Sequence, residues 1–215
     1  MRPELVIFDC DGVLVDSEAI SNVMLQDDLR AHGLDLTTDQ IVRMFIGGTI
    51  RGVWEEARRL GATLPDDWVA DFYARMYARL GEGTPLIPGV EAVLDRLDTA
   101  GIPYRVCSNG SDEKMATTLG QHPALWQRLS GKLFSAHRHG TAKPDPDLLL
   151  IAARDAGIAP AQSVMVDDSP AGCLAGIRAG MRVLGFAEHD DGARLREVGA
   201  EVFHHMDALP ELIRI

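Results

Sequence analysis

The chain has 215 residues, 46% of them hydrophobic, and a formal net charge of −11. This length supports one α/β domain with a small insertion, and no apolar run approaches the ~20 residues of a membrane-spanning helix. The acidic balance disfavours nucleic acids and anionic membranes as partners, but a small anionic substrate is compatible with it if the site supplies cations. The N-terminal apolar run is too short for a signal peptide, and the three cysteines lack metal-ligand spacing, so we expect a cytoplasmic protein with reduced, buried thiols.

Four apolar runs have the length of buried parallel strands, and a shorter run at residues 133–134 is a fifth candidate. The four longer runs are residues 5–8, 104–107, 163–166 and 181–186. Patterns with helical spacing separate them, at residues 90–97, 148–156 and 171–179. This alternation predicts an α/β fold with a doubly wound parallel sheet and right-handed crossovers.

Residues 17–83 interrupt the alternation. This stretch contains several helix-like segments and no convincing strand, and we expect most of its large apolar side chains to form a core of their own: Trp54, Trp68, Phe72, Tyr73, Met76 and Tyr77. The sequence therefore predicts a catalytic core of residues 1–16 and 84–215, with residues 17–83 inserted as an α-helical cap.

Polar residues follow the predicted strands at the edge where ligands bind in open α/β sheets. They are, in chain order, Asp9 and Asp11, Ser108 and Asn109, Lys143, and Asp167 and Asp168. In an extended chain, residues two apart point to the same side, so Asp9 and Asp11 can share one site. Taken singly, each aspartate could be only a turn residue or a helix cap. Four such junctions in this order favour a functional site.

Carboxylates gathered in a partly dry site repel one another and require a cation. Oxygen ligands favour a hard ion, and Mg²⁺ suits a few carboxylates together with a substrate phosphate. Lys143 adds a positive charge that a phosphate can bind. This combination can transfer a phosphoryl group through a covalent intermediate on Asp9, with Asp11 as acid and then base.

Four motifs in this order resemble those of the haloacid dehalogenase-like hydrolase superfamily. They are Phe-Asp-Cys-Asp-Gly at 8–12, Ser-Asn-Gly at 108–110, Lys-Pro-Asp-Pro at 143–146 and Asp-Asp-Ser-Pro-Ala-Gly at 167–172. The helical insertion is similar to the cap of the β-phosphoglucomutase-like branch. Within that branch, the motifs are similar to those of bacterial 6-phosphogluconate phosphatases. True dehalogenases lack the second aspartate of the first motif, so Asp11 argues against dehalogenation.

The resemblance implies roles for individual residues. Asp9 is the implied nucleophile and Asp11 the implied acid and base, while Ser108 and Lys143 are implied phosphate ligands. The implied Mg²⁺ ligands are Asp9, the Asp11 carbonyl and Asp168, with Asp167 either a direct ligand or a partner one step removed.

Weaker signals point to substrate contacts. Gly47 lies in a glycine-containing cap segment, and Arg51 after it could meet a second anionic group of the substrate. The alternative is a helix–helix turn with a solvated arginine. Lys114 could reach a substrate carboxylate or be only a helix surface charge, and Asn109 is a further candidate for substrate binding. The histidines form no recognisable metal site.

Three functions remain open at this stage. The first is a phosphatase acting on a small phosphorylated metabolite, a sugar or sugar-acid phosphate such as 6-phosphogluconate, and the second is a sugar phosphomutase with the same intermediate. The third is a non-catalytic phosphate-binding protein, which would require the loss of a motif residue, and none is lost. The mutase pattern has a histidine in the first cap helix, where this chain has Ser21. We expect a phosphatase that is a monomer or a weak homodimer.

Overall fold

The computed structural model describes residues 2–45 and 49–215, without the side chains of residues 42 and 43. It divides into two compact units, one of Met1–Asp16 and Pro85–Ile215 and the other of Ser17–Thr84. The boundary after the inserted unit falls between Thr84 and Pro85, one residue later than the sequence prediction placed it.

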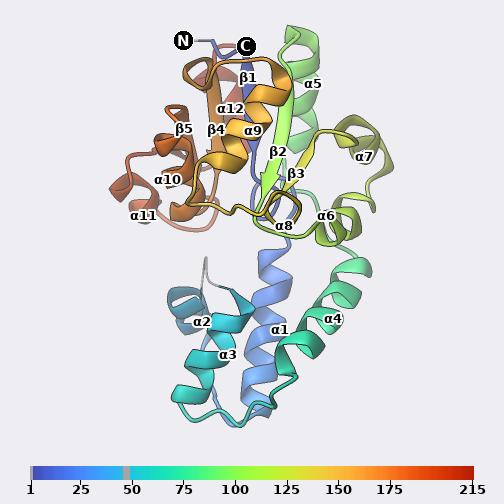
Figure 1. Cartoon of the computed structure of the whole chain (residues 1–215), viewed down its shortest axis with the longest axis vertical. Helices are drawn as coiled ribbons and strands as arrows, with labels where there is room; N and C mark the ends of the chain where they lie inside the picture. Colours follow the sequence, from blue (N-terminus) through green and yellow to red (C-terminus); the bar gives the residue numbers. More distant parts are fainter. Residues whose placement is uncertain (1, 46–48) are drawn as a thin grey trace. The chain divides into compact units, whose positions relative to one another are not determined.

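The larger unit is built on a six-stranded parallel sheet, in the order β3-β2-β1-β4-β5-β6. Figure 1 labels β1 to β5 of this sheet. The strands are β1 (Leu5–Phe8), β2 (Tyr104–Ser108), β3 (Leu133–Ser135), β4 (Ser163–Asp167), β5 (Arg182–Phe186) and β6 (Glu201–Phe203). The predicted α/β class with a doubly wound parallel sheet is confirmed. The sequence prediction missed β6, because its three residues are too few to show a period.

Both faces of the sheet are buried, which explains why its strands are apolar at successive positions. Val6 and Phe8 of β1 belong to the hydrophobic cluster on one face, and Leu5 and Ile7 belong to the cluster on the other. Because side chains alternate along a strand, a strand buried on both sides must be apolar throughout.

Helices cover the two faces. One face packs against α5 (Val90–Ala100), α6 (Asp112–Leu119), α7 (Pro123–Leu129) and α12 (Leu209–Leu212). The other packs against α9 (Asp147–Ala156), α10 (Pro170–Arg178) and α11 (Ala193–Glu197). A short helix, α8 (Ala136–His139), follows β3. Helices α5 and α9 both end at a left-handed glycine, Gly101 and Gly157, as their sequences predict.

The smaller unit is helical, and no strand occurs in its described residues. It contains α1 (Glu18–Ala31), α2 (Thr38–Phe45), α3 (Ile50–Arg59) and α4 (Trp68–Gly81). Trp68, Phe72 and Met76 are buried in its separate core, and the other three predicted members pack against that core while partly exposed. Across the described part of the chain, the helices are all too short or too polar to cross a membrane.

Candidate active site

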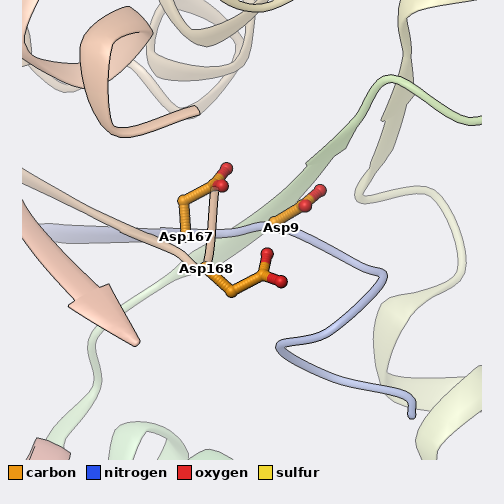
Figure 2. A group of neighbouring side chains, drawn as sticks. All are labelled: Asp9, Asp167 and Asp168. Atoms are coloured by element: carbon orange, nitrogen blue, oxygen red, sulfur yellow. The ribbon is translucent and has the colours of Figure 1, made fainter. Parts of the chain in front are cut away.

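Asp9, Asp167 and Asp168 come together where two central strands end. β1 and β4 are hydrogen-bonded neighbours with Phe8 opposite Val166, so the residues that follow emerge side by side. Asp9 N donates to Val166 O at 2.9 Å, which continues the pairing by one residue. Each of the three aspartates offers a carboxylate oxygen within 4.8 Å of the other two (Figure 2). The sheet thus builds an acidic cluster at the edge predicted from the sequence.

Lys143 lies against two of these carboxylates. Its Nζ is 2.8 Å from Asp9 Oδ1 and donates to Asp167 Oδ2 at 2.7 Å, and its side chain is only 2% exposed. Burying an ammonium group is costly unless it is paired, and here it has two partners. Burial by itself would lower the pKa of Lys143, but Asp167 and Asp9 raise it above its usual value. Lys143 is therefore a fixed positive charge in the site.

The surroundings of Asp9 disfavour the charged form of its carboxyl group. Burial, together with the charges of Asp167 and Asp11, raises its pKa to about 7 against the opposing charge of Lys143. Asp9 Oδ1 also accepts no hydrogen bond of regular geometry among the described residues, although Lys143 Nζ is close in distance. A buried carboxylate in this position is stabilised in its charged form by a further cation.

A hard divalent cation fits this cluster. The donors are oxygens alone, and the neighbouring acids Asp9, Asp11, Asp167 and Asp168 carry more charge than Lys143 and Lys114 balance. When all are ionised, four carboxylates and two ammonium groups leave two negative charges. An oxygen donor set with this residual charge is suited to Mg²⁺. The Asp11 carboxylate is not among the three that lie together, and the predicted metal contact of its carbonyl stays a prediction.

Ser169 holds Asp167 in place, a role that the sequence prediction did not assign. Its N–H and its hydroxyl both donate to Asp167 Oδ1, at 2.9 and 2.7 Å. The same hydroxyl accepts from Gly172 N and so caps α10, with Pro170 at the first helical position. A Ser-Pro pair is a common helix start, which is a signal that the sequence offers, but the contact of Ser169 with Asp167 depends on the strand-to-helix turn.

Two glycines make room for the carboxylates of the cluster. An added Cβ at Gly172 would lie 1.8 Å from Asp167 Oδ2, and one at Gly12 would lie 2.2 Å from Asp168 Oδ2. Gly12 also has φ +72°, a conformation that side-chain-bearing residues rarely adopt. Both positions therefore require glycine because of the site itself.

We expect Gly172→Ala to lower kcat about 100-fold, since displacing a catalytic group by about an ångström can have that effect. In a helix interior, alanine is more favourable than glycine by up to about 1 kcal/mol. The clash with Asp167 should outweigh this gain, for a net destabilisation of about 1–3 kcal/mol. The measurements are steady-state kinetics and urea unfolding.

The matched control is Gly83→Ala, where an added Cβ meets no atom within 4 Å and φ is not positive. Wild-type kcat in Gly172→Ala would contradict the steric role assigned to this glycine.

Asp11 and Lys114 form an ion pair beside the cluster. Lys114 Nζ is 2.8 Å from Asp11 Oδ1, and each side chain is 17% exposed. Ser108 is almost fully buried at the end of β2, and its Oγ accepts from Gly110 N at 2.9 Å. An added Cβ at Gly110 would lie 3.1 Å from Ser108 Oγ and 3.5 Å from Asp11 Oδ2, so Ser108 as well as Lys114 lies in the neighbourhood of Asp11. Lys114 is not the simple surface charge of the alternative interpretation.

The side chain of Asn109 binds the main chain of Lys143. Asn109 Nδ2 donates to Lys143 O at 3.0 Å, and Lys143 N donates to Asn109 Oδ1 at 2.8 Å. The sequence prediction placed Asn109 among the substrate contacts and did not foresee this link.

Arg51, one of the two substrate contacts predicted in the cap, pairs with neighbouring side chains of its own helix. Arg51 lies at the start of α3, where it pairs with Glu55 at 3.1 Å and stacks over the Trp54 ring at 4.6 Å. Both charged side chains are more than half exposed, so this pair is weak and leaves Arg51 able to exchange partners. Gly47 lies outside the described residues.

Comparisons with known proteins find relatives that match nearly the whole chain. The family model for haloacid dehalogenase-like hydrolases matches residues 3–180. The 6-phosphogluconate phosphatase of Escherichia coli (strain K12) is 32% identical over 213 residues, which are 98% of this chain and 95% of that protein. Hexitol phosphatase A of the same organism is 31% identical over 211 residues, with 97% and 94% coverage.

Among solved structures, a haloacid dehalogenase-like protein of unknown function from Agrobacterium tumefaciens str. C58 superimposes with a TM-score of 0.90. The two are 31% identical, and the match covers 98% of this chain and 97% of that one. The fold and the site define an acid-rich α/β hydrolase. The chain belongs to the haloacid dehalogenase-like hydrolase family, and its predicted enzyme class, phosphoric monoester hydrolase, is confirmed.

Proposed function

We propose that this enzyme is a Mg²⁺-dependent phosphatase that hydrolyses a small sugar or sugar-acid phosphate through an aspartyl-phosphate on Asp9. The observation that carries the proposal is the convergence of Asp9, Asp167 and Asp168, with the buried ammonium of Lys143 paired to Asp9 and Asp167. The three buried free cysteines are compatible with the cytoplasmic location that we include in the proposal.

The reaction has two steps, both carried by side chains of the larger unit. A carboxylate oxygen of Asp9 attacks phosphorus while the bond from phosphorus to the leaving oxygen breaks, and Asp11 gives that oxygen its proton. Water then attacks the phosphorus of the aspartyl-phosphate, Asp11 takes the proton of the water, and inorganic phosphate leaves with Asp9 restored. Lys143 and Ser108 bind the phosphoryl oxygens, and Lys143 balances their charge.

Asp9, the Asp11 carbonyl and Asp168 are the proposed ligands of Mg²⁺. When bound, the ion supplies positive charge that neutralises the phosphate and the carboxylates. Asp167 already accepts from Lys143 and twice from Ser169, so we propose that it contributes mainly by holding Lys143.

Activity is expected to require Mg²⁺ and to fall at least about tenfold when Ca²⁺ replaces it. Ca²⁺ prefers more ligands at longer distances, which would misplace the phosphate relative to Asp9. Phosphate release is measured after chelation with EDTA and after re-addition of each ion. Full activity in Ca²⁺, or after complete chelation, would contradict the proposed site.

A sugar-acid phosphate such as 6-phosphogluconate is the proposed substrate, because the named phosphatases of 6-phosphogluconate and hexitol phosphates are both similar over nearly the whole chain. We propose that Lys114 contacts the part of the substrate beyond its phosphate, and a substrate contact of Arg51 or Gly47 stays a prediction from the sequence. A phosphate-release screen over phosphorylated sugars, sugar acids and polyols tests this substrate class.

Hydrolysis is expected to dominate over isomerisation. Ser21, at the position of the histidine in the mutase pattern, donates its hydroxyl to Ser17 O at 2.9 Å and cannot change charge near neutral pH. The test supplies β-glucose 1-phosphate with a trace of the bisphosphate and follows both products. Glucose 6-phosphate accumulating faster than free phosphate would overturn the phosphatase assignment in favour of a mutase.

A further inference from the structure

We infer that Asn109 is a positioning residue that sets the place of the Lys143 ammonium through two hydrogen bonds to the Lys143 main chain. The inference rests on the proposed function only for its effect on turnover, because the placement of Lys143 is a structural property.

The geometry is that of a two-point clamp. One amide group both donates to Lys143 O, at 3.0 Å, and accepts from Lys143 N, at 2.8 Å, across 34 positions of sequence. Two bonds to one residue fix its direction as well as its distance, which a single bond does not. The clamp joins the end of β2 to the loop between α8 and α9, so it ties Lys143 to the sheet that also carries Asp9.

Lys143 needs such a clamp because it lies in a loop and its ammonium must serve two partners at once. Its Nζ is 2.8 Å from Asp9 Oδ1 and 2.7 Å from Asp167 Oδ2. A second tether holds the next residue, where Arg178 of α10 donates to Pro144 O at 2.8 Å. This second hydrogen bond lies on the exposed surface and holds Pro144, whereas the bonds of Asn109 hold the main chain of Lys143.

The contacts of the Asn109 amide indicate action through Lys143 rather than on the substrate. One N–H of Nδ2 and one lone pair of Oδ1 are bonded to the lysine main chain, so turning the amide toward a substrate would release the loop. Substitution of residues that orient an active-site group in this way typically costs about 10- to 100-fold in activity.

The experiment combines crystallography with kinetics on the full-length protein. Asn109→Ala is expected to shift Lys143 Nζ beyond ion-pair distance of Asp9 or Asp167 in a crystal structure. Its kcat for phosphate release should fall about 10- to 100-fold.

In the background of Lys143→Met, which keeps most of the side-chain volume, Asn109→Ala should change kcat less than about twofold, because coupled residues are not additive. The control is Glu113→Gln, on the exposed face of α6.

The outcomes separate the inference from the proposed function. Lys143 in its original place in crystals of Asn109→Ala overturns the inference whatever the kinetics, as does an equal fall in kcat with and without Lys143. A displaced Lys143 in a protein whose wild type hydrolyses no phosphate ester supports the clamp and overturns the phosphatase proposal. If Asn109→Ala does not fold, Asn109→Asp, which keeps the acceptor for Lys143 N and loses the donor, is tested with the same readouts.

Discussion

Replacing Asp9 by asparagine is expected to lower phosphate release by at least about 10⁴-fold, the scale of loss when an enzyme's nucleophile is removed. The amide is nearly the same size as the carboxylate but cannot attack phosphorus. Because asparagine keeps the shape of the side chain and Lys143 Nζ keeps Asp167 Oδ2 as a partner at 2.7 Å, the exchange should leave the fold unchanged. The measurement is kcat at saturating substrate and Mg²⁺, with circular dichroism to verify folding.

The matched control is Asp66→Asn, the same chemical change at a carboxylate 93% exposed on the helical unit. It should retain wild-type kcat. Phosphate transferred to protein should be detectable by acid quench in the wild type and absent in Asp9→Asn. Turnover of Asp9→Asn near the wild-type level would remove the aspartyl-phosphate mechanism.

Asp11→Asn is expected to lower kcat about 10²- to 10⁴-fold, the usual contribution of a positioned acid or base. Asparagine can neither give a proton to the leaving oxygen nor take one from water, so both half-reactions should slow. The two can be separated with p-nitrophenyl phosphate, whose leaving group needs little protonation. With that ester the first step should remain fast and the second slow, which gives a burst of p-nitrophenol followed by a slow phase.

The loss of charge at Asp11 also removes the partner of Lys114, whose side chain is only 17% exposed. The control is therefore Lys114→Gln, which breaks the same ion pair and keeps the carboxylate. If the two variants lost kcat for p-nitrophenyl phosphate equally, Asp11 would act through the ion pair and not as acid and base, because that ester lacks the part of the substrate that Lys114 is proposed to contact. A variant of Asp11 that slows only natural esters, with no burst from p-nitrophenyl phosphate, would indicate a different base for the second step.

The strand ends were predictable from the sequence because their physics is local. An apolar run buried on both faces must stop where polar residues begin, and parallel strands deliver those residues to one edge. Asp9, Asp167 and Asp168 could be assigned to one site on this ground, and Ser108 with them. Lys143 was also predicted to follow a strand, but it lies in the loop between α8 and α9. The helical insertion was visible for the same reason, as a change of period from that of strands to that of helices.

The interior of the site was not predictable in this way. Ser169 bonds to Asp167 only because the turn after β4 brings its hydroxyl back toward the strand, and Gly172 is required only because Asp167 lies over it. Neither contact leaves a periodic pattern in the sequence, because each arises from the close approach of two atoms in the folded chain.

The sequence by itself determined the class of fold, the edge of the sheet that carries the chemistry and the residue types available there. The tertiary structure alone decided which of those side chains pair with one another: Lys143 with Asp9 and Asp167, Lys114 with Asp11, and Asn109 with the main chain of Lys143. Hydrophobic periodicity specifies where an element lies and which face it buries, whereas a hydrogen bond or ion pair depends on distances of about 3 Å between residues far apart in sequence. Such distances exist only once the strands have taken their order in the sheet.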